Sequence, residues 1–174
     1  MAGYRDILTP DEVLARYHDG PQDGVFTDGS CDPNPGPGGW GVVWVKGNEI
    51  VRENHGFDPK TTNNRMEILA AIRSLETLKR PCHVVITTDS TYVKNGITKW
   101  IINWKKRQWR KSGGGKVVNI DLWQQLDKVV QQHQVSWEWV RGHSGHPGNE
   151  VADQLARAAI RQGIQGEIPA DPNG

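Results

Sequence analysis

The sequence lacks the features that mark secreted, membrane-spanning or zinc-finger proteins. Its longest apolar run, residues 40–45, is six residues long, whereas a membrane-spanning helix needs roughly 20. Residues 1–10 contain no apolar core typical of a signal peptide, so export is not expected. There are only two cysteines, Cys31 and Cys82, and neither belongs to a CxxC pair. A disulfide scaffold and a zinc finger are therefore excluded, and we expect a reducing, cytoplasmic location with no membrane partner.

The composition is that of a globular protein. The chain has 174 residues, of which 36% are hydrophobic and 24% charged, and its formal net charge is +1. This length is enough for one domain with its own core. Residues 1–23 are predicted to be an appendage with a short helix, residues 24–162 one domain, and residues 163–174, with three Gly and two Pro, a flexible tail. No long exposed apolar stripe is evident, so we expect a monomer.

The hydrophobic pattern predicts an α/β domain. Short apolar runs predict strands at residues 25–27, 40–45, 49–56, 83–88 and 135–140. Helical spacing predicts helices at residues 64–78, 92–108 (as one or two helices), 122–130 and 149–161. Residues 31–39 are rich in turn-forming residues, and Asn119 or Asp121 is expected to cap the helix that follows. This order predicts a mixed five-stranded sheet with helices packed on it.

Four acidic residues occupy positions where folding does not require a carboxylate. Asp28 and Asp89 each end an apolar strand, and Glu67 and Asp153 lie near the starts of helices. Singly, each has an ordinary explanation as a cap or a solvated first-turn acid. Together they suggest a site, because ligands of open α/β sheets bind at the carboxyl ends of strands. Converging carboxylates repel one another, and their oxygens favour Mg²⁺ or Mn²⁺ over zinc as the stabilising cation.

A basic segment lies between residues 99 and 116. It contains seven Lys and Arg residues and no acid, which leaves the rest of the chain with a net charge of −6. Such asymmetry predicts a localised phosphate-binding face. Trp100, Trp104 and Trp109 lie among these cations. They either stack on bases or sugars, or pack within the protein, since Trp100 and Trp104 are four residues apart.

Five motifs occur in order over residues 25–161. They are FTDGS with NPGPGG (26–30 and 34–39), TTNNRME (61–67), TDS (88–90), the basic tryptophan segment with DLW (121–123), and GHSGHP with Asp153. These motifs resemble those of type 1 ribonuclease H in its bacterial form. The resemblance implies a ribonuclease H-like fold, with three antiparallel strands and then two parallel ones. It also implies endonucleolytic hydrolysis of the RNA strand of RNA–DNA hybrids with one or two Mg²⁺ ions, or Mn²⁺, leaving 5′-phosphate and 3′-hydroxyl ends.

The resemblance also implies roles for individual residues. The metal-binding acids would be Asp28, Glu67, Asp89 and Asp153. His143 would be a mobile catalytic histidine, since an ordinary imidazole titrates near neutral pH. The side-chain amides expected to contact a 2′-hydroxyl are those of Asn34, Asn63 and Asn64. The pocket expected for a phosphate of the DNA strand consists of Lys60, Thr62 and Asn119. The residues of the basic segment expected to contact the hybrid are Trp100, Trp104, Lys105 and Lys106. At position 60 this chain has Lys where many relatives have Arg. Lys keeps the positive charge but lacks the bidentate fork of the Arg guanidinium.

Three other functions fit parts of the pattern. A module that binds hybrids without cutting them would be expected to lack an acid, and all four are present. A transposase or resolvase core would share the broad fold but not TTNNRME or the basic tryptophan segment. A two-carboxylate glycosidase would act without a metal. Residues 36–41 satisfy GxGxxG but precede a strand, and residues 112–116 lack the spacing of a P-loop, so neither predicts nucleotide binding.

Overall fold

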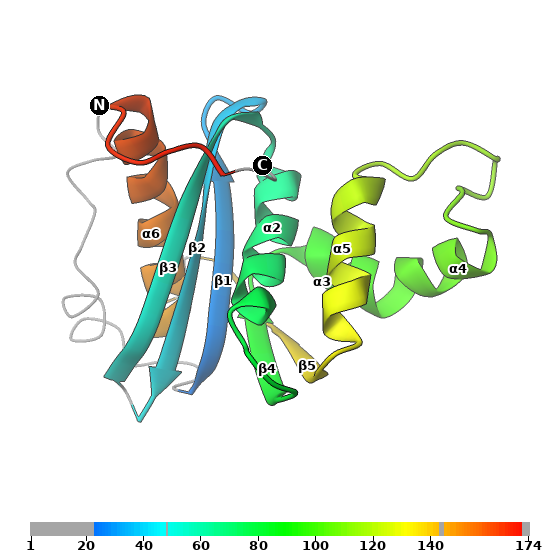
Figure 1. The fold of residues 1–174 in the computed structure, drawn as a ribbon, viewed down its shortest axis with the longest axis horizontal. Coiled ribbons are helices and arrows are strands. Elements are labelled where there is room, and N and C mark those ends of the chain that lie inside the picture. The colour runs from blue at the N-terminus through cyan, green and yellow to red at the C-terminus, as the bar shows by residue number, and fades with distance from the viewer. Residues whose placement is uncertain (1–22, 48, 143–144, 172–174) are drawn as a thin grey trace.

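The computed structural model describes residues 23–47, 49–142 and 145–171 (Figure 1). The expected N-terminal helix and His143 lie outside these residues. The strands are β1 (Gly24–Cys31), β2 (Gly36–Lys46), β3 (Glu49–Thr61), β4 (His83–Thr88) and β5 (Gln134–Trp139). The helices are α2 (Asn63–Glu76), α3 (Thr91–Asn95), η2 (Gly96–Trp100), α4 (Ile101–Lys106), α5 (Ile120–Val130) and α6 (Pro147–Ile164). No described helix has both the length and the apolar character needed to cross a membrane.

The strands form one sheet in the order β3-β2-β1-β4-β5. β1, β2 and β3 pair antiparallel, and β4 pairs parallel with both β1 and β5. The predicted five-stranded mixed sheet is therefore confirmed. Its two parts meet between β1 and β4, and the carboxyl ends of these two strands lie at the same end of the sheet.

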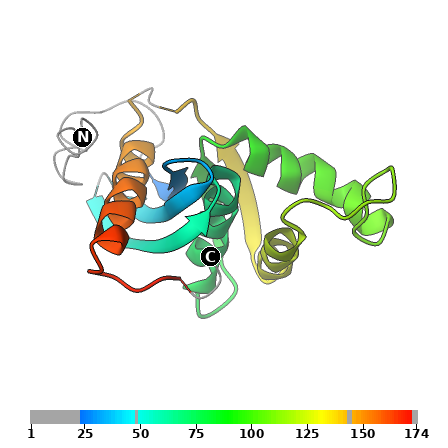
Figure 2. The same ribbon diagram turned by 90° about the horizontal axis from the view of Figure 1, so that it is seen from above.

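Helices cover both faces of the sheet (Figures 1 and 2). α6 packs on β1, β2 and β3, whereas α2 packs on the other face and against α5. The core on the α2 side includes Met66 and Trp123, and the smaller core on the α6 side includes Phe26 and Val151. All four side chains are fully buried, so the sheet has no large solvent-exposed face at its centre.

Two glycines of β2 allow α6 to pack directly on this strand. A Cβ atom on Gly39 would lie 2.3 Å from the carbonyl oxygen of Ala156, and one on Gly41 would lie 2.4 Å from that of Ala152. α6 therefore lies directly against the backbone of β2. The glycine-rich residues 36–39, expected in a turn-rich stretch, are strand residues, and Gly39 among them allows this close packing.

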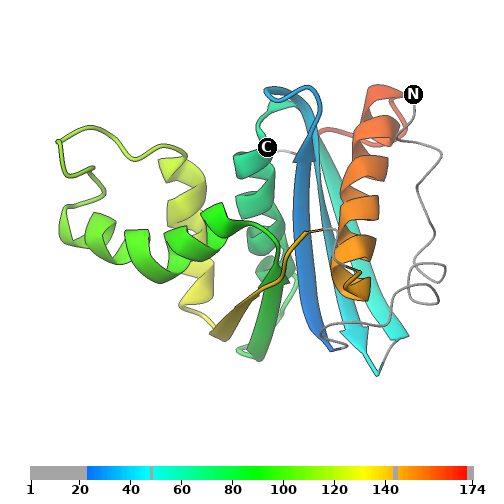
Figure 3. The same ribbon diagram turned by 180° about the vertical axis from the view of Figure 1, so that it is seen from behind.

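The region predicted as one or two helices is a continuous helical stretch with a wider π-helical section in its middle, η2. It leads away from the sheet, and α4 with the loop after it stands at one end of the molecule (Figure 3). Gly96 is required here, because a Cβ at this position would lie 2.0 Å from the ring of Trp123 on α5. The basic segment is thus carried on a projection anchored to α5.

The residues after α6 contact the sheet at their far end. Ala170 pairs with Phe57 of β3, and the carboxylate of Asp171 lies 2.6 Å from Nη2 of Arg73 on α2. The indole nitrogen of Trp40 also donates a hydrogen bond to Asp171 at 3.1 Å. This buried contact anchors a segment for which the Gly and Pro content predicts flexibility.

Candidate active site

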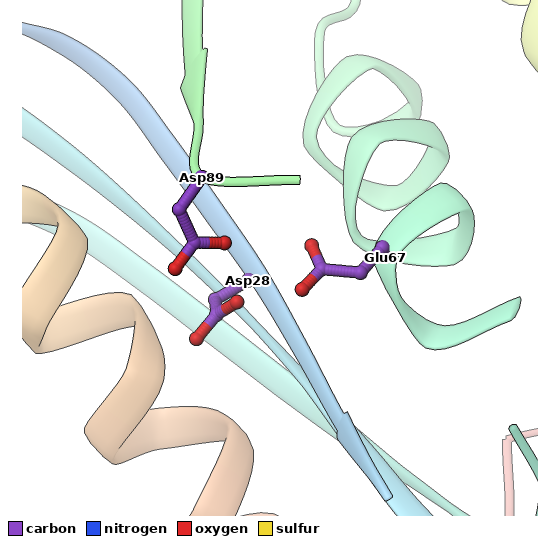
Figure 4. Close-up of side chains that lie close together, drawn as sticks. All are labelled: Asp28, Glu67 and Asp89. Carbon is purple, nitrogen blue, oxygen red and sulfur yellow. The ribbon is translucent and has the colours of Figure 1, made fainter. Parts of the chain in front are cut away.

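Three carboxylates converge where β1 and β4 lie side by side (Figure 4). Thr27 of β1 pairs with Thr88 of β4 in parallel register, so Asp28 and Asp89, the next residues, are neighbours. Glu67 reaches toward them from the second turn of α2. One oxygen from each of the three carboxylates lies within 4.8 Å of the others. The structure therefore brings together acids that are far apart in the sequence.

Gly29 allows α2 to approach this closely. A Cβ at position 29 would lie 2.3 Å from the backbone nitrogen of Glu67 and 2.4 Å from the carbonyl carbon of Met66. The helix begins just before this contact, where Thr62 accepts a hydrogen bond from the Arg65 amide at 3.2 Å. The cap and the glycine together fix the height of Glu67 beside Asp28.

Burial makes these carboxylates difficult to ionise together. Asp28 is 4% exposed and Glu67 is 9% exposed. Burial, followed by repulsion from Glu67 and Asp89, raises the pKa of Asp28 well above its ordinary value. Burial also raises the pKa of Glu67 to about 8, and the charge of Asp89 adds to the effect. The explanation of Glu67 as a solvated first-turn acid therefore fails, because it is buried and does not lie in the first turn of α2.

The donor set fits a divalent cation. Oε2 of Glu67 is buried and has no hydrogen-bond partner among the described residues. All the converging ligand atoms are carboxylate oxygens, which are the ligands that Mg²⁺ and Mn²⁺ prefer. A cation at this position would satisfy the unpaired oxygen and offset the mutual repulsion of the acids.

Asp153 approaches the same site from α6. It is 8% exposed, it lines the same hollow as the three clustered acids, and its charge raises the pKa of Asp28 further. Oδ2 of Asp153 lies 3.0 Å from Nη2 of Arg157, one helical turn along. The first-turn acid of α6 is Glu150, so Asp153 belongs to the second turn. Sequence reasoning missed Arg157, although its four-residue spacing from an acid is a signal for a helical ion pair.

Two of the three asparagines predicted to contact a 2′-hydroxyl line the hollow that the acids share. Asn63 and Asn64 lie on its wall and are exposed. Neither caps α2, because Thr62 has that role, so their side chains remain available. Asn34, in the loop between β1 and β2, accepts a hydrogen bond through its side-chain oxygen from the backbone N–H of Asn63 at 3.1 Å.

The predicted phosphate-binding residues lie beside a polar network. Lys60 is exposed at the end of β3. Asn119 precedes α5 but makes no capping bond; its oxygen accepts from Nη1 of Arg65 at 3.2 Å, and its amide donates to the hydroxyl of Tyr92 at 3.1 Å. Asp121 pairs with Arg65 at 2.7 Å, and this contact lowers the pKa of Asp121. Sequence reasoning missed the two partners of Asn119, which come from other elements.

The basic segment is exposed, but its tryptophans have different environments. Trp100 is 37% exposed, and its ring packs 6.0 Å from Trp104 and 5.6 Å from Tyr92, centroid to centroid. The ring of Trp104 is partly buried and also packs 5.5 Å from Trp123. Packing, one of the two explanations considered for these tryptophans, therefore accounts for much of Trp104. Lys105 lies 3.3 Å from Asp127 of α5, so part of its charge is neutralised within the protein.

Comparison with known proteins gives the family of this arrangement. The RNase H family model matches residues 21–161. The chain belongs to the RNase H family. Family membership makes it a metal-dependent hydrolase that cuts the RNA strand of RNA–DNA hybrids, as the five motifs predict.

Individual members of the RNase H family agree with this assignment. The ribonuclease H of Methylococcus capsulatus (strain Bath) is 58% identical over 147 residues, which cover 84% of this chain and 94% of that protein. The crystal structure of LC9-RNase H1, a type 1 RNase H with the type 2 active-site motif, matches with a TM-score of 0.69 and 37% identity, over 90% of this chain and 81% of that one. LC11-RNase H1, solved with an RNA/DNA hybrid, shares the fold with a TM-score of 0.57 and 20% identity, over 80% of this chain and 97% of that one.

Proposed function

We propose that Asp28, Glu67, Asp89 and Asp153 are the catalytic acids of this ribonuclease H and that they bind one or two Mg²⁺ ions, with Mn²⁺ as a substitute. The observation that carries this proposal is the clustering of the first three carboxylates within 4.8 Å where β1 and β4 lie side by side. Cations held there would assist phosphodiester hydrolysis by activating water and stabilising the leaving oxygen. The expected products carry 5′-phosphate and 3′-hydroxyl ends.

Other side chains of the protein bind the substrate and transfer a proton. Asn63 and Asn64, with Asn34 beside them, face the hollow of the acids and offer amides to a 2′-hydroxyl, the group that distinguishes RNA from DNA. His143, which lies between β5 and α6 in the sequence, transfers a proton during the reaction. The Lys60, Thr62 and Asn119 group binds a phosphate of the DNA strand.

The basic segment extends the binding surface. The cations of α4 and the following loop, including Lys106, bind the phosphates of the hybrid, and the exposed face of Trp100 stacks on a base or sugar. Lys105 and Trp104 contribute less than their sequence positions suggest, because Asp127 and the neighbouring aromatic rings already contact them.

Residues 24–162 form the nuclease domain in this proposal, and the protein acts as a cytoplasmic monomer. The thiols of Cys31 and Cys82 are free in the described part of the chain, which suits a reducing compartment. The large apolar side chains that are exposed are scattered over different elements, which suits a monomer.

The deciding experiment is the cleavage of an end-labelled RNA–DNA hybrid by the full chain. Duplex DNA, duplex RNA and single-stranded RNA serve as comparison substrates, each with Mg²⁺ and with EDTA. We expect cleavage of only the RNA strand of the hybrid, and its loss in EDTA. Cleavage that persists in EDTA would overturn the metal mechanism.

The Asp28→Asn variant tests the role of the acid cluster. Removing one carboxylate deprives the cations of a ligand, so kcat is expected to fall at least a hundredfold. The same change removes a buried like charge, so the variant is expected to melt at a higher temperature than the unchanged protein in EDTA. A kcat within tenfold of the unchanged protein would contradict the assignment.

A further inference from the structure

Trp139, the last residue of β5, is attached to the backbone of a proposed metal ligand. Its indole nitrogen donates a hydrogen bond to the carbonyl oxygen of Asp89 at 3.0 Å. Trp139 is paired with Thr88, the last residue of β4, in the parallel register of the two strands. The side chain therefore crosses from β5 to the residue that immediately follows β4.

Asp89 lies at a junction where the backbone leaves the strand and enters α3. The strand side is fixed by Thr88, whose carbonyl accepts from the Val140 amide at 3.0 Å and whose hydroxyl accepts from the Ser90 amide at 3.0 Å. The helix side is fixed by Ser90, which caps α3 through the Val93 amide at 3.1 Å. The bond from Trp139 holds the peptide between these two fixed points.

The indole ring is itself held in place by α3. Nζ of Lys94 lies 5.7 Å from the centre of the Trp139 ring, a distance typical of a cation–π contact. Trp139 is nevertheless 41% exposed, so a large part of its apolar surface stays in contact with solvent. Its hydrogen bond to the Asp89 carbonyl therefore accounts for its position better than burial of apolar surface does.

We propose that Trp139 is a positioning residue of the active site, whose indole N–H sets the orientation of Asp89. The carboxylate of Asp89 is joined to its backbone by only two rotatable bonds, so a shift of the peptide moves the ligand oxygens. Catalytic constellations need positioning within about 0.5 Å, and loss of a residue that orients a metal ligand typically lowers metal affinity or activity 10–100-fold. Trp139 acts through Asp89 and does not touch the reacting atoms.

The test compares Trp139→Phe with Trp137→Phe in the full chain. Trp139→Phe keeps an aromatic ring beside Lys94 but removes the N–H donor. Trp137 lies two residues earlier on β5, packs against the core, and has no hydrogen bond from its indole among the described residues. The measurements are kcat and KM on the hybrid, the Mg²⁺ concentration for half-maximal activity, and the binding of Mg²⁺ without substrate by calorimetry.

For Trp139→Phe we expect kcat to fall about tenfold and Mg²⁺ affinity to weaken about tenfold, while KM changes less than twofold. Thermal unfolding in EDTA is expected to be nearly unchanged for this variant. Trp137→Phe is expected to lower the unfolding temperature and leave kcat and Mg²⁺ affinity within twofold. Unchanged kcat and Mg²⁺ affinity in folded Trp139→Phe would overturn the inference, as would a change in KM alone.

This inference rests on the proposed role of Asp89, and one further variant separates the two. If Asp89→Asn is inactive while Trp139→Phe is fully active and binds Mg²⁺ normally, the proposed function stands and the positioning role is wrong. If Asp89→Asn itself retains activity within tenfold of the unchanged protein, the proposed function is wrong.

Discussion

At the scale of single residues, Glu67 links the active site to the stability of the metal-free protein. Burial raises its pKa to about 8, against an ordinary value of 4.5. Between these two pH values the folded state retains a proton that the unfolded chain has released. The free energy of unfolding therefore falls as the pH rises through this window.

We expect the metal-free protein to lose up to a few kcal/mol of stability between about pH 4.5 and about pH 8. Urea unfolding in EDTA at the two ends of the range measures this loss, and added Mg²⁺ should restore stability at the upper end. Glu67→Gln is the control, because it cannot ionise and should show a flatter dependence. An identical slope in both proteins would assign the pH dependence to other groups.

The residue scale is also where the sequence was most informative about the site. Asp28 and Asp89 were identified as residues that end apolar strands, and the structure places them side by side. The predicted strand end is right for Asp89, which follows β4, but β1 continues through Asp28 to Cys31 because it still pairs with β2 there. Trp139 was missed, because its contact with Asp89 depends on side-chain direction and on strand register, which no linear pattern of residue types shows. Arg157 was missed although its four-residue spacing from Asp153 is a signal for a helical ion pair.

At the scale of secondary-structure elements, the contact between α2 and β1 controls the geometry of the acids. Gly29→Ala is expected to force α2 away from β1, because the new Cβ would lie 2.3 Å from a backbone nitrogen that cannot move independently. We expect a loss of stability of about 1–3 kcal/mol and a kcat at least tenfold lower. Chemical unfolding and hybrid cleavage measure the two effects.

Gly113→Ala provides the matched control for Gly29→Ala. No atom lies within 4 Å of a Cβ built on Gly113, which is in the exposed loop after α4. The substitution is expected to change stability by less than about 0.5 kcal/mol and to leave kcat unchanged. A similar loss in both variants would mean that the close packing at Gly29 is not the cause.

Most secondary-structure elements were predictable from the sequence. The residues that were predicted wrongly are ones whose role depends on contacts with other elements. The bounds of β4 match the predicted residues, since a run of β-branched residues specifies a strand locally. The glycine-rich start of β2 was predicted as a loop because glycine favours turns, whereas here Gly38 makes room for Thr61 and Met66, and Gly39 for α6. The left-handed backbone of Asn119, with φ of 60°, likewise serves a network with Arg65 and Tyr92 rather than a helix cap.

At the scale of the whole molecule, the concentrated positive charge of the basic segment lies apart from the acids of the candidate active site. The basic segment projects from one end of the fold (Figure 1), while the four acids line one hollow where β1 and β4 lie side by side. A phosphate-binding surface outside the active site should govern affinity more than the rate of the chemical step. The charge asymmetry in the sequence predicted such a surface, but not that α4 would carry it away from the sheet.

The double variant Lys106→Ala with Arg107→Ala tests this separation. We expect a several-fold higher KM for the hybrid, a weaker dependence of KM on salt, and kcat within about twofold. Lys79→Ala with Arg80→Ala is the control, because it removes the same charge from exposed positions between α2 and β4, at the opposite end of β4 from the acids. Equal effects of both double variants would indicate a general charge effect rather than a binding face.

The separation of the four acids along the chain also bears on how long the folded state survives. They come from β1, α2, the end of β4 and α6, so a cation bound as proposed would meet all four acids only after these elements have assembled. A ligand that binds only the native state stabilises it, and interactions absent from the folding transition state slow unfolding without speeding folding. Stopped-flow measurements should therefore show that Mg²⁺ lowers the unfolding rate and leaves the refolding rate unchanged, making the catalytic ion a determinant of the protein's lifetime.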